Sequence, residues 1–441
     1  MAAIFTFIFV SSVEGVTMYA EVGVFVLLYA FLQWFSSIGR DVPIRWLIVC
    51  VALVQWVVAP FLSYHFFTES EFYGMVIDET EYMNYVVPAT LAYSLILLLP
   101  LGRKKANWEV NFSNDLGYIR KAGRLLYIVG ILSYLLRTSM PASLGYFFGL
   151  MQNFSIIGAM YLYLANVQGK MIWLILSFAP VLINAGESSV FHDLILWGGY
   201  LFMLYAFIDR ITVTRKVVLT AAGLLMVVLI QSIKKDYRTA IFENDDASKT
   251  ELIMEIAGEK LEENQSEDFW QAFVDRLNQG WIIARIMDKV PSEEPYAMGK
   301  TISDGVRAAF VPRILDPNKP KSGGGENFEK YTGIALRGAS MNLGLVGEAY
   351  ANFGRNGGIL FMAIYGLFFN LVFRQITRVS YQRPEIILWV PFLFFYVVKA
   401  EDDFLTAFNQ FMKSAFLVVA VLWYMKRFRI PPASIEEESA S

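Results

Sequence analysis

Apolar and polar residues alternate along this chain in long blocks. A helix that crosses a bilayer needs about 20 mostly apolar residues, and runs of this kind recur from one end of the chain to the other. The predicted spans are residues 17–35, 44–64, 82–101, 119–137, 142–165, 171–187, 190–208, 216–233, 356–374, 385–399 and 409–426. Residues 1–13 are apolar but short, and form either a further span or an interfacial segment. The pattern predicts an all-α integral membrane protein with roughly 11–12 transmembrane helices.

The short polar segments between these spans differ in the sign of their charge. The basic segments are 102–124, 209–216, 374–384 and the C-terminal end, and the acidic segments are 65–81 and 400–409. Counting the spans places every basic segment on one side and both acidic segments on the other. Because short loops rich in Lys and Arg stay in the cytoplasm, we expect a cytoplasmic C-terminus. The long polar segment 234–355 is then extracytoplasmic.

This layout divides the chain into regions. They are N-terminal transmembrane helices (1–233), a large periplasmic or extracellular loop with a partly helical cap (234–355), C-terminal transmembrane helices (356–430) and a disordered cytoplasmic tail (431–441). Within the loop, apolar residues at helical spacing predict an amphipathic helix over 269–287. That helix either packs on the bundle or lies in the membrane interface.

Composition agrees with a membrane protein and narrows the chemistry. Hydrophobic residues make up 56% of the chain and charged residues only 17%, whereas soluble domains carry roughly 25% charge. The single cysteine, Cys50, rules out an intramolecular disulfide, and the only histidines are His65 and His192. No Cys/His metal cluster can form from these residues, so we expect no metal and no cofactor. The N-terminus lacks the basic residues of a cleaved signal peptide, and none is expected.

Candidate chemistry gathers in the loop and at its end. Residues 341–355 (MNLGLVGEAYANFGR) place Glu348, Tyr350, Asn352 and Arg355 just before an apolar span. Ionisable groups at the mouth of a membrane helix are expensive to place and are therefore functional candidates. Residues 323–325 are three successive glycines, which form either a plain turn or a backbone cradle for phosphate.

Four loop segments resemble, in order, the pattern of bacterial Wzy-type O-antigen and oligosaccharide repeat-unit polymerases. They are KKDYR (234–238), YAMGKT (296–301), PRILDPNKP (312–320) and GEAYANFG (347–354). The resemblance implies a GT-C-like membrane glycosyltransferase that needs no metal. It also implies undecaprenyl-pyrophosphate-linked oligosaccharides as donor and acceptor, a bacterial inner-membrane location and a periplasmic active site. A chain-length regulator and a flippase are the implied partners, and nucleic acid is not.

In one region the chain departs from that pattern. Relatives, including the O-antigen ligases, carry an Arg near the start of a mid-chain span, whereas residues 184–193 (NAGESSVFHD) contain none. Either His192 or Glu187 takes that role, or the role lies in the loop.

The implied reaction is displacement of lipid pyrophosphate from the anomeric carbon by an acceptor hydroxyl. Arginine suits the leaving group because its planar fork pairs phosphate oxygens bidentately, and a carboxylate suits the hydroxyl as base or orienting acceptor. The predicted catalytic residues are Glu348, Arg238 and Arg313, and the predicted substrate-binding residues are Arg337, Tyr350, Asn352, Arg355, Lys319, Tyr237 and His192.

Each of these residues also has a structural interpretation. Glu348 could pair with an arginine to anchor the loop, Arg238 could snorkel to the interface, and His192 could be a packed histidine. The pair Asp402–Asp403 is predicted to lie in a solvated outer loop. Three other functions stay open: a ligase of the same class, a non-catalytic assembly partner, and a glycolipid or solute transporter, which should show broken helices and polar residues in mid-span.

Overall fold

The computed structural model describes most of the chain. The described residues are 13, 15–68, 70, 72–100, 102, 116–188, 191–243, 267–311, 315–322, 324–336 and 340–428. The predicted C-terminal tail lies outside them.

Helices make up the ordered structure, and the described residues contain no β-strand. The α-helices are α2 (Met18–Ser37), α3 (Ile44–Leu53), α4 (Ala59–His65), α5 (Glu79–Leu97), α6 (Leu116–Leu136), α7 (Ala142–Met151), α8 (Phe154–Leu164), α9 (Lys170–Ser188), α10 (His192–Asp209), α11 (Val213–Glu243), α13 (Glu267–Leu277), α14 (Gly280–Lys289), α15 (Lys300–Phe310), α16 (Gly325–Thr332), α17 (Leu345–Ser380), α18 (Val390–Leu393) and α19 (Phe404–Met425). A π-helical turn (Val54–Val58) joins α3 to α4, and 3-10 turns occupy Arg137–Ser139, Pro384–Trp389 and Lys426–Phe428.

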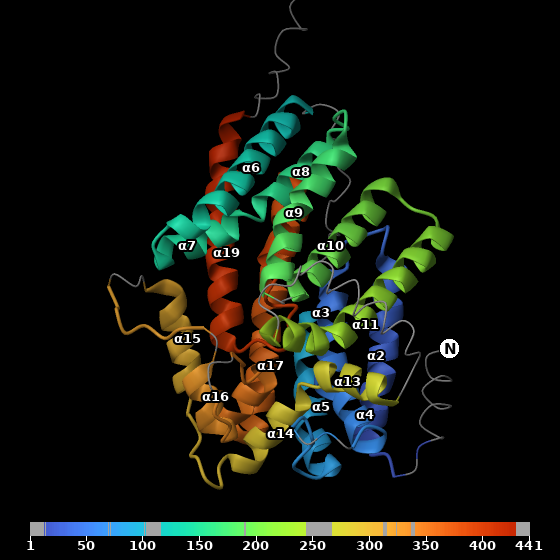
Figure 1. Cartoon of the computed structure of the whole chain (residues 1–441), viewed down its shortest axis with the longest axis vertical. Coiled ribbons are helices and arrows are strands. Elements are labelled where there is room, and N and C mark those ends of the chain that lie inside the picture. Colours follow the sequence, from blue (N-terminus) through green and yellow to red (C-terminus); the bar gives the residue numbers. More distant parts are fainter. Residues whose placement is uncertain are drawn as a thin grey trace, which may run out of the picture.

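Six segments among the described residues are long and apolar enough to cross a membrane. They are Met18–Ser37, Ile44–His65, Leu144–Leu164, Val213–Ile230, Leu345–Ser380 and Phe404–Met425. The predicted all-α class is confirmed, and length and composition identify a membrane protein. In Figure 1 the loop helices α13–α16 gather at the lower end of the bundle beside the start of α17, and α6, α8 and α9 lie towards the upper end.

Small residues allow the closest helix pairs. On α17 the exposed face carries large apolar side chains such as Leu360, Ile364 and Leu367, as expected of a surface in contact with lipid. Its opposite face packs on α5, where a Cβ at Gly366 would come within 2.6 Å of the Tyr93 carbonyl oxygen. Membrane helices use small residues in this way because close backbone approach replaces a hydrophobic driving force.

The predicted span at 385–399 is wrong as a continuous helix. Residues Pro384–Trp389 form a 3-10 turn, α18 has only four residues, and turns continue to the start of α19. Proline lacks a backbone N–H and disrupts helix interiors, and Pro391 follows Pro384 within this segment. The aromatic side chains still enter the core, where Phe394 stacks on Phe373 with ring centroids 4.1 Å apart.

The amphipathic helix predicted over 269–287 is two helices that pack on the bundle. The break lies at Asn278, whose side-chain oxygen accepts a hydrogen bond from the Gly280 N–H. Gly280 fits closely against Pro60 and Tyr82, and Trp281 and the residues after it are buried. The loop is therefore fastened to the helices from α14 onward.

A glycine contact between α6 and α8 generates a stability prediction. A Cβ at Gly130 would lie 2.1 Å from the Ser155 backbone nitrogen, a group that cannot move aside. We expect Gly130→Ala to destabilise the protein by about 1–3 kcal/mol through overpacking, measured as a lower unfolding temperature in detergent. Gly198→Ala on α10 is the matched control, because no atom lies within 4 Å of its new Cβ. Equal unfolding temperatures for the two variants would contradict the close approach of α6 and α8.

Candidate functional site

Glu348 lies in the first turn of α17 and is 2% exposed. Its Oε2 accepts a hydrogen bond of 2.6 Å from the backbone N–H of Phe404, the first residue of α19. A side-chain hydrogen bond also joins Glu348 to Thr301 on α15. A carboxylate is favourable at a helix N-terminus, where unpaired N–H groups gather. Glu348 therefore links α17, α19 and the loop at one point.

Asn352 joins two of the motif-bearing segments. Its Nδ2 donates to the Thr301 hydroxyl at 2.7 Å and to the Glu348 carbonyl at 2.8 Å, and its Oδ1 accepts from the Gly299 N–H at 3.0 Å. The backbones also pair, through Ala297 N–H to the Ala351 carbonyl and Met298 N–H to the Asn352 carbonyl. Segments 296–301 and 347–354 thus form one unit. Within it, the oxygen and the nitrogen of the Asn352 side-chain amide both have hydrogen-bond partners.

A kink follows this unit. Gly354 adopts φ 64° and ψ −166° within α17, a conformation that favours glycine. The Tyr296 side chain lies over it, with its phenol oxygen 3.0 Å from the position a Cβ would take. Tyr350 stacks edge-on against Tyr85 with centroids 4.9 Å apart and hydrogen-bonds Tyr296. Arg355, the residue after the kink, is exposed.

The prediction that Asp402 and Asp403 are solvated is wrong, because they are 8% and 5% exposed. The turn before α19 carries them into the bundle instead of around it. Asp403 caps α19 by accepting from the Thr406 N–H at 2.8 Å. Asp402 accepts from the Asn342 side-chain amide at 3.0 Å. Burial raises the pKa of the Asp402 carboxyl well above its ordinary range, while Lys399 opposes the rise.

Two side-chain pairs fasten this turn to the start of α10. Lys399, itself 8% exposed, places its Nζ 2.8 Å from an Asp193 carboxylate oxygen. His192 places its Nδ1 3.1 Å from Glu401. Lys399 also lies over the Tyr396 ring at 4.3 Å, so its charge is surrounded by groups that favour a cation. His192 therefore belongs to this group and not to the Glu348 unit.

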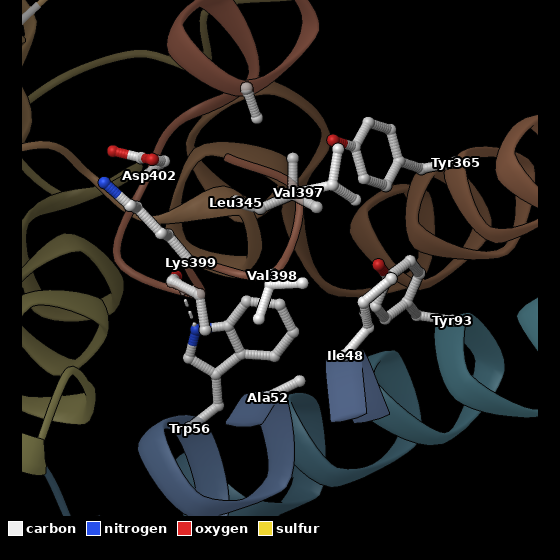
Figure 2. A pocket seen from close by; sticks show the side chains of 12 residues that line it. Ile48, Ala52, Trp56, Tyr93, Leu345, Tyr365, Val397, Val398, Lys399 and Asp402 are labelled. Carbon is white, nitrogen blue, oxygen red and sulfur yellow. Dashed lines mark hydrogen bonds between the residues drawn. The ribbon is translucent and has the colours of Figure 1, made fainter. Parts of the chain in front are cut away.

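A small pocket lies between the turn and the N-terminal helices (Figure 2). Its lining residues are Ile48, Ala52, Trp56, Tyr93, Leu345, Tyr365, Val397, Val398, Lys399, Ala400, Asp402 and Ala407. Trp56 belongs to the π-helical turn and donates its indole N–H to the Ala400 carbonyl at 3.0 Å. The phenol oxygens of Tyr93 and Tyr365 point towards the pocket. The lining is mostly apolar, the Lys399 and Asp402 side chains lie at one edge, and the pocket has room for little more than one water molecule.

The remaining predicted site residues either make contacts away from Glu348 or lie outside the described part of the structure. Lys319 donates its Nζ to the Val311 carbonyl at 2.7 Å and braces the proline-rich segment. Tyr237 and Arg238 lie in α11, but their side chains fall outside the described part of the structure, as does that of Glu187. Arg313 and Arg337 lie outside the described residues altogether. Their roles stay predictions.

Several residues of the site escaped sequence reasoning. Lys399 is the last residue of the predicted span 385–399, and Asp402 falls in the outer loop predicted after it. The charge cluster 399–403 (KAEDD) directly after buried aromatics was the available signal. The sequence gave no reason to single out Thr301 from the rest of segment 296–301. Arg137 is the last residue of the predicted span 119–137. Its Nη2 donates to the side chain of Asn184 at 2.6 Å, and Asn184 belongs to the segment 184–193 that contains no arginine.

Within the described residues, no group of three or more His, Cys, Asp and Glu side chains is placed to hold a metal ion. The site consists of the Lys399–Asp193 ion pair, the capped start of α19 and the small pocket beside the turn.

Fold and site together define an all-α membrane protein whose buried charges gather where an interrupted apolar segment meets a helical loop. Residues 103–430 match the family described as Domain of unknown function (DUF8712), and the chain belongs to that family. No curated protein matches the chain, and neither does any solved structure.

Asp402 predicts a pH dependence of stability. A carboxyl with a raised pKa binds its proton more tightly in the folded state, so its contribution is greatest in acid. That contribution falls as the pH rises above the ordinary value of 3.8 towards the raised folded value. We expect Asp402→Asn, which mimics the protonated group, to unfold at a higher temperature than wild type at alkaline pH and to lose this advantage in acid.

Thermal unfolding across the pH range measures this difference, with Asp304→Asn as control because Asp304 lies on the loop helix α15 and pairs with exposed Lys300. A constant difference between Asp402→Asn and wild type at every pH would show that Asp402 does not titrate as described.

Proposed function

We propose that this protein is a membrane glycosyltransferase that polymerises undecaprenyl-pyrophosphate-linked oligosaccharide repeat units into a surface polysaccharide such as O-antigen, capsule or exopolysaccharide. The observation that carries the proposal is the joining of segments 296–301 and 347–354 through Asn352. Both segments belong to the pattern that resembles Wzy-type polymerases, and their union around Glu348 is what a shared active site requires.

In the proposed reaction the acceptor hydroxyl attacks the anomeric carbon of the donor sugar. The bond from that carbon to the pyrophosphate oxygen breaks, and the hydroxyl proton passes to a base. Glu348 is the proposed base, and it must exchange its bond to the Phe404 N–H for one to the hydroxyl. Arg355, together with Arg238, Arg313 and Arg337, is proposed to stabilise the charge on the departing pyrophosphate.

The proposed topology has roughly 11–12 spans in a bacterial inner membrane, with the loop outside and the C-terminus in the cytoplasm. Basic side chains support this orientation. Arg45 donates to the Leu97 carbonyl, Arg383 to the Leu422 carbonyl and Lys216 to the Ile38 carbonyl. These contacts lie at the C-terminal ends of α5, α19 and α2, away from the Phe404 end of α19 that Glu348 caps. Positive charge concentrated on one side is typical of the cytoplasmic face.

A transporter is the second candidate function, and a specific observation favours it. The apolar segment 384–403 is interrupted, a π-helical turn faces it, and Lys399 and Asp402 line the pocket between them. Discontinuous helices around buried polar groups are typical of transporter binding sites. A ligase of the glycosyltransferase class would use the same Glu348 unit with another acceptor.

The decisive experiment measures polysaccharide length in cells that carry Glu348→Gln or Arg238→Ala, at membrane levels matched to wild type. Gln retains an oxygen that can accept from the Phe404 N–H, so α19 stays capped while the base is lost. Loss of a general base lowers rates by about 10²–10⁴-fold. We expect single-repeat glycan without long polymer.

Glu329→Gln is the matched control, because Glu329 is exposed on α16 of the same loop, and its polymer should keep the wild-type length. Polymer of normal length in both Glu348→Gln and Arg238→Ala would remove the proposed site. Normal polymer in those variants together with altered solute or glycolipid passage in Lys399→Met would favour the transporter.

A further inference from the structure

Arg137 lies in the 3-10 turn directly after α6 and is held from three directions. Its Nη1 donates to the Gln152 side-chain oxygen at 2.8 Å, and its Nη2 donates to the Asn184 side-chain oxygen at 2.6 Å. The guanidinium also lies over the Tyr134 ring at 4.7 Å. Gln152 follows α7 and Asn184 belongs to α9, so separate elements fix one cation in place.

The groups that hold Arg137 in the described part of the chain are all neutral. Among the described side chains, no carboxylate lies within ion-pair distance of it, in contrast to Lys399 with Asp193 or Arg307 with Asp316. Arg137 is half-buried, and a partly desolvated charge without a counter-ion is costly. An arginine fixed by amide oxygens keeps further N–H donors for an anion.

The helices that carry or hold Arg137 have exposed apolar side chains. The exposed apolar residues nearest in sequence to Arg137 and to the two elements that hold it are Leu132, Leu135, Leu136, Leu144, Leu182 and Ile183. A soluble anion gains nothing from such a surface. A molecule with an anionic head and hydrocarbon chains matches both the charge and its surroundings.

Arg137 follows the end of α6 that is opposite its basic residues. Helix α6 has 21 residues, and its first turns carry Arg120, Lys121 and Arg124. At a rise of 1.5 Å per residue, Arg137 lies about 20 Å along the chain from Arg124. The cation at Arg137 is therefore separate from this basic cluster.

We propose that Arg137, positioned by Gln152 and Asn184, binds the phosphate group of a membrane lipid whose chains lie along the exposed leucines of α6 and α9. The guanidinium pairs two phosphate oxygens, and the chains cover apolar surface that is exposed in the isolated chain. The inference extends the proposed function, because that reaction uses phosphate-bearing lipids, but lipid binding needs no turnover. Normal polymer in Glu348→Gln and Arg238→Ala, together with lipid binding that depends on Arg137, would count against the proposed function alone.

The test uses the purified full-length protein in phosphatidylcholine vesicles that contain spin-labelled phosphatidic acid. The measured quantity is the affinity of the protein for the labelled lipid, read from the immobilised fraction. We expect Arg137→Gln to weaken this affinity about tenfold or more, as removal of a hydrogen bond to a charged group does. Arg124→Gln is the matched control, because Arg124 is exposed at the other end of the same helix, and its affinity should stay at the wild-type value.

Two further variants keep the test decisive if Arg137→Gln folds poorly. Arg137→Lys keeps the charge without the fork, and Asn184→Leu keeps Arg137 without one of its holding groups, so each should bind more weakly than wild type. Wild-type affinity in all three variants would overturn the proposal. Competition by inorganic pyrophosphate as strong as by unlabelled phosphatidic acid would also overturn it, because the site would then recognise a free anion. An equal affinity for spin-labelled phosphatidylcholine, whose choline balances the phosphate charge, would show that the site does not select an anionic head and would overturn the proposal.

Discussion

The buried start of α19 is the constraint on which the arrangement of the site depends. The first N–H groups of any helix lack partners inside it, and here they lie within the bundle. Glu348 and Asp403 satisfy them from two different elements. Because Glu348 comes from α17, the capping of one spanning segment fixes the position of another. The same residue reaches Thr301, so the loop joins this arrangement.

A second consequence concerns the turn that precedes α19. Its backbone and its charges are buried together, so each needs an internal partner. Trp56 supplies a donor to the Ala400 carbonyl, Asn342 supplies one to Asp402, and Asp193 neutralises Lys399. These partners come from the N-terminal helices, from α10 and from the chain before α17. The turn thus gathers polar partners from segments that are far apart in the sequence.

Sequence reasoning predicted those parts of this structure that depend on local composition. Apolar run length predicts helices, and it located α2, the segment Ile44–His65 and α19 within a few residues. It could not predict the break at 394–403, because the run there is as apolar as a span and the interruption depends on Pro384, Pro391 and long-range packing of Phe394 on Phe373. Burial of Asp402 was missed for the same reason, since a carboxyl after a span looks solvated until the path of the chain is known.

The candidate site shows the same division. The segment around Glu348 was identified from its residues. The hydrogen bond from the Phe404 N–H to Glu348 could not be predicted, because every residue except proline has a backbone N–H. The role of Asn352 within the joined unit depends on Gly299 and Thr301, about fifty positions away along the chain. Lys399, Asp193 and Arg137 became visible only through their contacts. Contacts between side chains that are far apart along the chain cannot be predicted from a single sequence.

Helix α17 has a mechanical property that follows from the kink at Gly354. The nine residues before the kink are bound to the loop through Asn352 and to α19 through Glu348, and those after it form the long membrane rod up to Ser380. One covalent element therefore contains a short segment fastened to the loop and to α19 and a long apolar segment, joined at Gly354. A displacement of segment 296–301 would also displace the first nine residues of α17, because Asn352 bonds to Gly299 and Thr301. The backbone at Gly354 would then have to absorb the change in angle.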